Sequence, residues 1–468
     1  MDLRLNSGSH VNNQAHEDEK YERLKMVFLT ASFFCIIGSY SVIKELKSSI
    51  FAYMVGGDYI PFAKPFSMFA LVPAIFIYSK LVDSLRRYWL LCLYSGFFAV
   101  MGLIFAYLLD HPQMGIVNTD SSPYRFFAWI LYFWVEAYSP FVVSVFWSYA
   151  NSVTSPEGAK KNYAWMVAGS KLGGVVMAGL SMLLLNLRND AGKQFYSDVA
   201  NHQLLLVASS VLLMMVPILI TIMMRRVPSR YLHGYEAAYK VETKSSNQKK
   251  DHTGVLVGIK MLLRYPYVMG IFAMAFFYDV CATVLSWLSV AVAQRNSDTM
   301  SATLSKLLWI VFCTQLIGFL IAMIGTSALF RILGTRRCLL LIPISAGIAF
   351  LYFIFNFDSP QALTITFVAL RSINYAFSWP LRESLYIPTV KDIKFKSKSW
   401  IDAFGAKAAK TSGSMFNILS AWFGSGVLVF SSFFSVIIGL WFVAAWLLGR
   451  KFDKAIKNNE VIGSDYEQ

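Results

Sequence analysis

Long apolar segments dominate this chain of 468 residues and limit the folds that it can adopt. Each extends for roughly the 20 residues that an α-helix needs to cross a bilayer, and short polar loops separate them. A segment inside lipid must satisfy its own backbone hydrogen bonds, so the sequence predicts an all-α integral membrane protein. With a window of that length, about twelve spanning helices can be counted. They cover residues 26–52, 61–82, 89–109, 126–152, 163–187, 203–224, 267–293, 304–329, 338–357, 361–389, 400–430 and 431–449.

The basic residues of the loops predict one orientation in the membrane. A net charge of +15 would indicate a nucleic-acid partner in a soluble protein, but most Lys and Arg here lie in short loops. Basic loops, such as those with Arg86-Arg87 and Arg336-Arg337, alternate with loops that hold few cations. We therefore expect the lipid bilayer, and no nucleic acid, as a partner, with both termini in the cytoplasm.

The polar stretches divide the chain into five predicted parts. We expect a disordered cytoplasmic arm at residues 1–25, a six-helix half at 26–224 and a cytoplasmic linker at 225–265. A second six-helix half at 266–450 and a cytoplasmic tail at 451–468 follow. The halves contain similar motifs, since Gly169-Ser-Lys171 matches Gly405-Ala-Lys407 at the equivalent helix. Two parallel six-helix halves with a site at mid-membrane depth resemble the major facilitator architecture.

Charged residues within the apolar segments are the candidates for a binding site. Residues at a spacing of three, four or seven share one face of a helix. One such face carries Arg371, Tyr375, Ser378 and Arg382, and a second carries Lys407, Lys410, Thr411 and Ser414. A charge at bilayer depth costs about 2.5–3.5 kcal/mol on insertion scales, so it usually faces a polar interior. The two faces therefore predict a path for an anion, and the alternative is that some cations reach the membrane surface.

The first predicted helix carries another charged cluster. Lys44 and Lys47 lie on the same side as Tyr40, with Glu45 between the two lysines. In the alternative interpretation the helix ends at residue 43 and the cluster lies in an outer loop. Together with Lys171, the cations within the spans outnumber the acids there, and a bound polyanion such as a phosphate compound would balance them.

Three acids within the spans, Glu45, Glu136 and Asp279, are candidates for gating or coupling. Glu136 is by default a functional residue at this depth, either as a gating ion-pair partner or as a proton site. The alternative is a structural pair with a nearby lysine. Asp279 is a weaker candidate, and Asp402 suits either substrate binding or a helix cap with Ser399.

The sequence contains no motif that indicates an enzyme. It lacks the Walker A, HExxH and GxSxG patterns, so we expect neither ATP hydrolysis nor a resident cofactor. The five cysteines are scattered singly, which argues against a metal site or a disulfide framework. All six histidines lie outside the predicted spans, which excludes a histidine proton relay.

Four stretches carry a resemblance to a known family. They are Lys44-Glu-Leu-Lys47 with the following Ile60-Pro-Phe-Ala-Lys64, the segment from Glu136 to Lys160, Arg382-Glu-Ser-Leu-Tyr-Ile-Pro388, and Lys398 to Lys410. These resemble motifs of the ATP/ADP translocases, the nucleotide transporters of intracellular bacteria and plastids. The resemblance covers about residues 28–449. It implies that the functional residues of the family correspond here to Lys47, Glu136 and Arg382.

The chain departs from that family in the seventh predicted helix. Where the family has Glu-Val-Thr-Trp-Lys, this sequence has Val284-Leu-Ser-Trp287-Leu288, without the acid and the base. The resemblance implies ATP/ADP antiport by alternating access, in a bacterial inner membrane. Two alternatives stay open: proton-coupled import of other nucleotides or NAD, and a membrane receptor that binds nucleotide without transporting it.

Overall fold

The computed structural model describes most of the chain as helix. The described residues are 3–154, 156–188, 194–228, 231–232, 255–324, 334–386, 388–390, 393, 397–424, 426–458 and 460–463. Within these ranges there is no strand, only two isolated β-bridges, Arg188 with Gln194 and Thr389 with Ile462. The predicted all-α class is confirmed. Most of the predicted linker, residues 233–254, lies outside the described ranges.

All twelve predicted segments coincide with helices, several of which contain a π-helical turn. The first six segments correspond to α1 (Leu3–Phe51) with η1 (Ala52–Gly56), α2 (Ile60–Ser84), α3 (Arg87–Leu108), α4 (Phe126–Tyr138) with η3 (Ser139–Val143) and α5 (Ser144–Val153), α6 (Pro156–Leu185) and α7 (Asp198–Arg226). The others correspond to α10 (Pro266–Arg295), α11 (Met300–Ile324), α13 (Thr335–Phe355), α14 (Pro360–Ile373) with η5 (Asn374–Ser378) and α15 (Trp379–Ser384), α16 (Lys398–Trp400) with η7 (Ile401–Gly405) and α17 (Ala406–Trp422), and α18 (Val427–Lys457). A short helix, α9 (Val255–Arg264), precedes α10.

Within the described ranges, nine helices are long and apolar enough to cross a membrane. The first of these spans continues from α1 into α2, which joins two of the predicted segments. The tenth and eleventh segments are not among the nine. Both carry charged and polar residues, such as Arg371, Arg382, Lys407 and Lys410, which lower their hydropathy.

Two sequence-based boundaries are wrong. The break predicted at residue 430 lies earlier, because α17 ends at Trp422 and α18 begins at Val427. Gly424 between them has φ 73°, a left-handed conformation that ends helices and suits glycine. The N-terminal arm is also not disordered, since α1 begins at Leu3. Lys25 of this extension is fully buried and donates hydrogen bonds to Glu22 and to the carbonyl of Tyr231.

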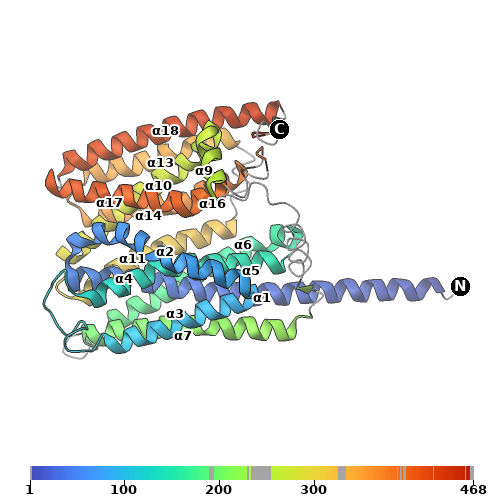
Figure 1. Cartoon of the computed structure of the whole chain (residues 1–468), viewed down its shortest axis with the longest axis horizontal. Helices are drawn as coiled ribbons and strands as arrows, with labels where there is room; N and C mark the ends of the chain where they lie inside the picture. The colour runs from blue at the N-terminus through green and yellow to red at the C-terminus, as the bar shows by residue number, and fades with distance from the viewer. Residues whose placement is uncertain are drawn as a thin grey trace. The chain divides into compact units, whose positions relative to one another are not determined.

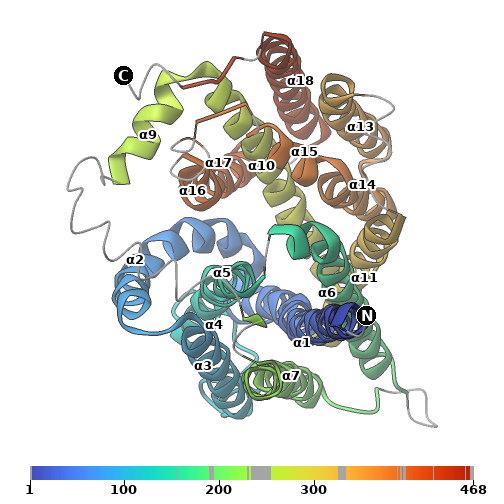
Figure 2. The same ribbon diagram turned by 90° about the vertical axis from the view of Figure 1, so that its right-hand side faces the viewer.

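The chain forms two compact units. Unit 1 comprises Met1–Lys47, Leu71–Asn118 and Phe133–Lys249, and unit 2 comprises Ser48–Ala70, Thr119–Tyr132 and Lys250–Gln468. In unit 1, α3 and α7 lie side by side (Figures 1 and 2). In unit 2, α10 packs against α14, α17 and α18, and α13 packs along α18 (Figure 2).

Glycines allow the closest helix contacts in each unit. In unit 1, a Cβ atom on Gly173 of α6 would collide with the backbone carbonyl of Phe34 in α1. In unit 2, a Cβ on Gly405 would lie 2.7 Å from the ring of Phe272, and one on Gly413 would lie 2.8 Å from the carbonyl oxygen of Val280, both in α10. The two Gly-x-Lys motifs therefore lie in helices that approach a neighbour through glycine, which is the local similarity that the repeat predicted.

The π-helical turns interrupt one of the predicted polar faces. Because η5 lies between Arg371 and Arg382, the regular spacing on which their common face depended is lost. Tyr375 is 39% exposed, whereas Ser378 is 5% exposed, so these two side chains do not share an environment. The prediction of a single face for Arg371, Tyr375, Ser378 and Arg382 is wrong. The face of Lys407, Lys410 and Ser414 is continuous, since α17 is regular from Ala406.

The glycine contact of unit 1 gives a test of the packing. We expect Gly173→Ala to lower the apparent melting temperature of the purified protein, because overpacking typically costs about 1–3 kcal/mol and the obstacle here is backbone. Gly96→Ala in α3 is the matched control, since no atom lies within 4 Å of its added Cβ. It should be neutral or slightly stabilising, as Ala favours helix over Gly. Equal melting temperatures for the two variants would contradict the close approach of α6 and α1.

Candidate functional site

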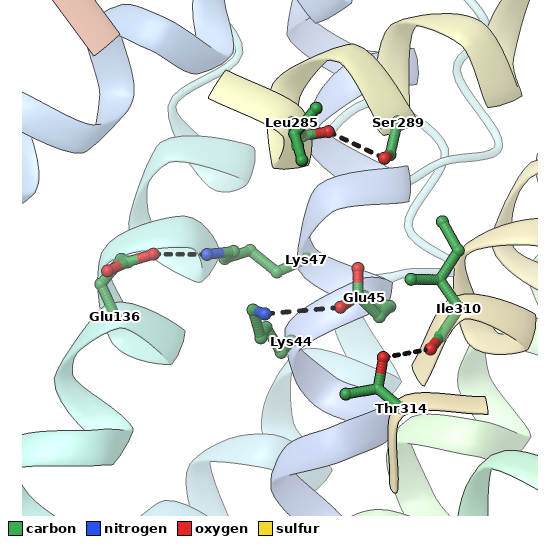
Figure 3. A network of polar contacts seen from close by, with 8 residues as sticks. All are labelled: Lys44, Glu45, Lys47, Glu136, Leu285, Ser289, Ile310 and Thr314. Atoms are coloured by element: carbon green, nitrogen blue, oxygen red, sulfur yellow. Dashed lines mark hydrogen bonds and ion pairs between the residues drawn. The ribbon is translucent and has the colours of Figure 1, made fainter. Parts of the chain in front are cut away.

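A buried ion pair joins two helices of unit 1. Lys47 Nζ of α1 donates to Glu136 Oε1 of α4 at 2.5 Å, and Figure 3 shows the two side chains pointing toward each other. The side chain of Lys47 is 4% exposed and that of Glu136 is 17% exposed. One turn further along, π-helical η3 begins at Ser139 next to Pro140, which lacks the N–H that a regular turn needs. Such turns are frequent at functional sites.

The position of this pair depends on α1 and α4 being in register. The hydroxyl of Tyr138 donates to the carbonyl oxygen of Ile36 at 3.0 Å, and the ring of Tyr138 stacks on Tyr40 at 5.1 Å. Tyr138 lies two residues after Glu136 on α4, while its partners Ile36 and Tyr40 precede Lys47 on α1 by eleven and seven residues. The two contacts fix α4 against α1, so the carboxylate of Glu136 is held at the height of Lys47.

Of the other predicted residues of unit 1, Glu45 and Lys171 are buried, whereas the side chain of Lys44 is 32% exposed. Lys44 Nζ lies 3.6 Å from Glu45 Oε1, and the Glu45 side chain is 8% exposed (Figure 3). Lys171 of α6 is 9% exposed. Because α1 continues to Phe51, the alternative that places Lys44 and Lys47 in an outer loop is wrong. Unit 1 therefore presents three lysines on membrane-spanning helices, as the sequence predicted.

A second group of charges lies in unit 2, around Asp279 of α10. The charges of Lys410, Arg382, Asp402 and Lys64 all act on its carboxylate, and we name these five residues the Asp279 cluster. Arg382 Nη2 lies 3.7 Å from Asp402 Oδ1, with side chains 18% and 44% exposed. The cluster brings residues of α2, α10, α15 and α17 together with the turn η7, although they are far apart in the sequence.

Two members of this cluster differ from the sequence-based interpretation. Asp402 lies inside η7, between α16 and α17, and pairs with Arg382, so the alternative of a helix cap with Ser399 is wrong. Lys64 was noted only as part of a motif and was not among the predicted site residues. Its position after Pro61 at the start of α2 was the available signal, because a lysine so close to a spanning helix has to find a polar environment.

The remaining predicted residues of unit 2 lie on neighbouring elements. The guanidinium of Arg371 lies over the ring of Phe367, 4.0 Å from its centroid. Arg371 and Tyr375 both interact electrostatically with Tyr278 of α10. Lys407 is partly buried on α17. The sequence did not predict an ion pair next to Arg382, in which Lys398 Nζ donates to Glu383 Oε2 at 2.6 Å.

The two positions that depart from the family pattern are apolar and buried. Val284 is 0% exposed and Leu288 is 9% exposed, both within α10. The tryptophan between them is kept, and Trp287 Nε1 donates to the carbonyl oxygen of Gly57 at 3.2 Å. The acid and base are thus replaced by side chains that pack as ordinary core residues.

The Asp279 cluster carries more positive than negative charge. Lys64, Arg382 and Lys410 contribute three cations, while Asp279 and Asp402 contribute two carboxylates. Charges withdrawn from water need a partner of opposite sign, since desolvation is not otherwise repaid. The arrangement therefore suits an anion that carries several charged oxygens, for which Arg offers a planar fork and Lys a point charge.

Comparisons with known proteins agree with a transporter of anionic substrates. A model of the TLC ATP/ADP transporter family matches residues 9–452. The chain is 22% identical to ADP,ATP carrier protein 1 of Rickettsia bellii and 24% identical to that of Rickettsia prowazekii, in each case over 94% of this chain and 96% of the relative.

Solved structures share the fold at low identity. The proton:xylose symporter XylE of the major facilitator superfamily superposes with a TM-score of 0.57 at 12% identity, over 93% of this chain and 96% of its own. The nucleoside transporter NupG gives 0.57 at 10% identity, over 92% and 99%. Together with the charged residues that its spanning helices carry, these matches show that the chain belongs to the TLC ATP/ADP transporter family and has a major-facilitator-like fold.

Proposed function

We propose that this protein exchanges ATP for ADP across a membrane by alternating access. The observation that carries the proposal is that Lys64, Arg382 and Lys410 act together around Asp279, because the charged oxygens of a polyphosphate can bind to several cations and a neutral solute cannot. The names of the Rickettsia relatives support the same substrates. A bacterial inner membrane with both termini in the cytoplasm is the matching location, supported by the basic loops.

Charge balance also explains why exchange is favoured over net transport. A site with a net positive charge would carry it through the membrane field when it reorients empty, at about 2.3 kcal/mol per charge for 100 mV. A bound nucleotide polyphosphate offsets that charge, so the loaded protein reorients more easily than the empty one. A carrier of this kind returns with a second nucleotide, which is antiport.

Proton-coupled net import is the second candidate function. Its support is the apolar pair Val284 and Leu288, since the family has an acid and a base at these positions. Protonation of Asp279 or Glu136 would then supply the coupling, because either change alters the charge that the site carries. In this mode the Lys47–Glu136 pair has to break in each cycle.

Counterflow in proteoliposomes distinguishes the two modes. For antiport, we expect uptake of labelled ATP only when ADP or ATP is present inside, because the empty site reorients slowly. A proton gradient without internal nucleotide should leave uptake at the level of protein-free liposomes. Uptake into nucleotide-free vesicles that depends on the gradient would establish the second candidate instead, and nucleotide binding without any uptake would indicate a receptor.

Arg382 provides a test of phosphate recognition. Hydrogen bonds to charged groups contribute roughly 1.5–3 kcal/mol, so Arg382→Ala should weaken ATP binding by about tenfold to a hundredfold. The loss should be smaller for ADP and smallest for adenosine, because fewer phosphate oxygens remain to be bound. Arg382→Lys restores the charge and should recover much of the affinity.

Because Arg382 also forms an ion pair with Asp402, the binding measurements need a control that removes this pair alone. Asp402→Asn removes the partner of Arg382 but leaves the guanidinium in place. It should therefore weaken ATP binding less than Arg382→Ala does. If Arg382→Ala reduced the affinities for adenosine, ADP and ATP equally, Arg382 would hold helices together and would not bind phosphate.

Glu136 provides a test of gating. Glu136→Gln keeps the size of the side chain but removes the charge that neutralises Lys47, and we expect it to lower the exchange rate at least tenfold while ATP affinity changes little. Glu19→Gln is the matched control, since it alters an exposed ion pair with Arg23 outside the candidate site. An unchanged exchange rate for Glu136→Gln at normal expression would show that its pair is structural.

A further inference from the structure

Two buried polar side chains of α17 lack hydrogen-bond partners among the described residues. Asn417 is 1% exposed, and neither its Nδ2 nor its Oδ1 atom is hydrogen-bonded. Ser414, one turn earlier, is 0% exposed, and its hydroxyl is also unpartnered. Buried polar groups are nearly always satisfied in native proteins, so three such atoms within one turn need an explanation.

The neighbouring helix α10 packs closely on this part of α17, where Val280 and Thr283 lie against Gly413. The glycines of the α17 segment place Gly405 against Phe272 and Gly413 against Val280, so the two helices run in the same direction. One turn beyond Gly413 is Asn417, and one turn beyond Val280 is Val284. The side chain of this fully buried valine, one of the two departures from the family motif, has no group that can pair with an amide.

The unpartnered groups continue the cationic face of α17. Asn417 follows Lys407, Lys410 and Ser414 at intervals of three, four and three residues, which keeps all four on one side of a regular helix. Seven residues separate Lys410 from Asn417, or about 10 Å at the usual helical rise. That separation is comparable to the distance from the phosphates to the base of an extended nucleotide.

We propose that Asn417, assisted by Ser414, binds the base edge of the nucleotide while Lys410 lies toward its phosphates. The inference rests on the proposed function. A carboxamide presents one donor and one acceptor side by side, which matches the adjacent donor and acceptor on the edge of a nucleobase. It carries no charge, and its apolar surroundings suit a planar base better than a phosphate. The base would form the hydrogen bonds that the side chains of Asn417 and Ser414 lack within the protein.

The test is Asn417→Leu, a substitution of similar volume, in the purified full-length protein. Affinities for ATP and for inorganic tripolyphosphate are measured together with the melting temperature without ligand. We expect ATP affinity to fall at least tenfold and tripolyphosphate affinity to stay within twofold. The melting temperature should be unchanged or higher, because the substitution removes an unsatisfied buried amide. Ser414→Ala should show the same pattern to a smaller extent.

Ser412→Ala is the matched control on α17. Its exposed hydroxyl already donates to the carbonyl oxygen of Ala408, so it should change neither affinity nor stability. The inference is overturned if Asn417→Leu keeps wild-type ATP affinity. It is also overturned if the variant unfolds or melts several degrees lower, or weakens both ligands equally, because the amide would then be structural or held by water.

The wild-type protein separates this inference from the proposed function. If it binds tripolyphosphate as tightly as ATP, the base contributes nothing, so base recognition fails while phosphate recognition stands. If it binds neither ligand, the proposed function and the inference fail together.

Discussion

The burial of charge in an apolar bundle is the constraint on which the rest of the structure depends. Lys47 is almost completely withdrawn from solvent and is stable there because Glu136 lies at hydrogen-bond distance. That distance requires α1 to continue past Lys47 and α4 to be fixed against it, and the Tyr138 hydrogen bond to Ile36 provides the second condition. Removing either partner would leave a buried charge, so the pair couples the packing of these helices to the electrostatics of the site.

Close helix packing and charge occur together in both units for a physical reason. A helix that carries a lysine into the membrane has to be shielded from lipid on that side, and glycine lets a neighbouring backbone approach. In α6, Gly169 and Gly173 flank Lys171 and face α1, while in the α17 segment Gly405 and Gly413 face α10. Both Gly-x-Lys motifs therefore combine a contact surface with a cation, and their spacing allows the two to point to different sides of one helix.

Hydrophobic periodicity was sufficient to predict the spanning helices, because length and polarity decide which segments cross a bilayer. It could not predict the π-helical turns, since one extra residue in a turn leaves the composition unchanged, and this is why the common face of Arg371 and Arg382 was wrong. Candidate residues were recognisable as charges in apolar segments. Their partners were not, because 89 residues separate Lys47 from Glu136 and only the fold brings them together. The helix-cap interpretation of Asp402 used only its sequence neighbour Ser399, whereas its ion-pair partner Arg382 lies on another helix.

The apolar pair in α10 shows how such a site can change without loss of the fold. Replacement of a buried acid and base by well-packed hydrophobic residues is often neutral or stabilising, because the desolvation penalty of both charges disappears. Val284 and Leu288 fill these positions as core residues, and Asp279 is the acid that α10 retains. Under the proposed function, recognition by polar groups would then depend more strongly on α17, where Lys407, Lys410 and Asn417 lie on one face. Because the acid and base were lost together, the net charge of the site is unchanged, and the consequence of the change lies in which substrate groups are contacted.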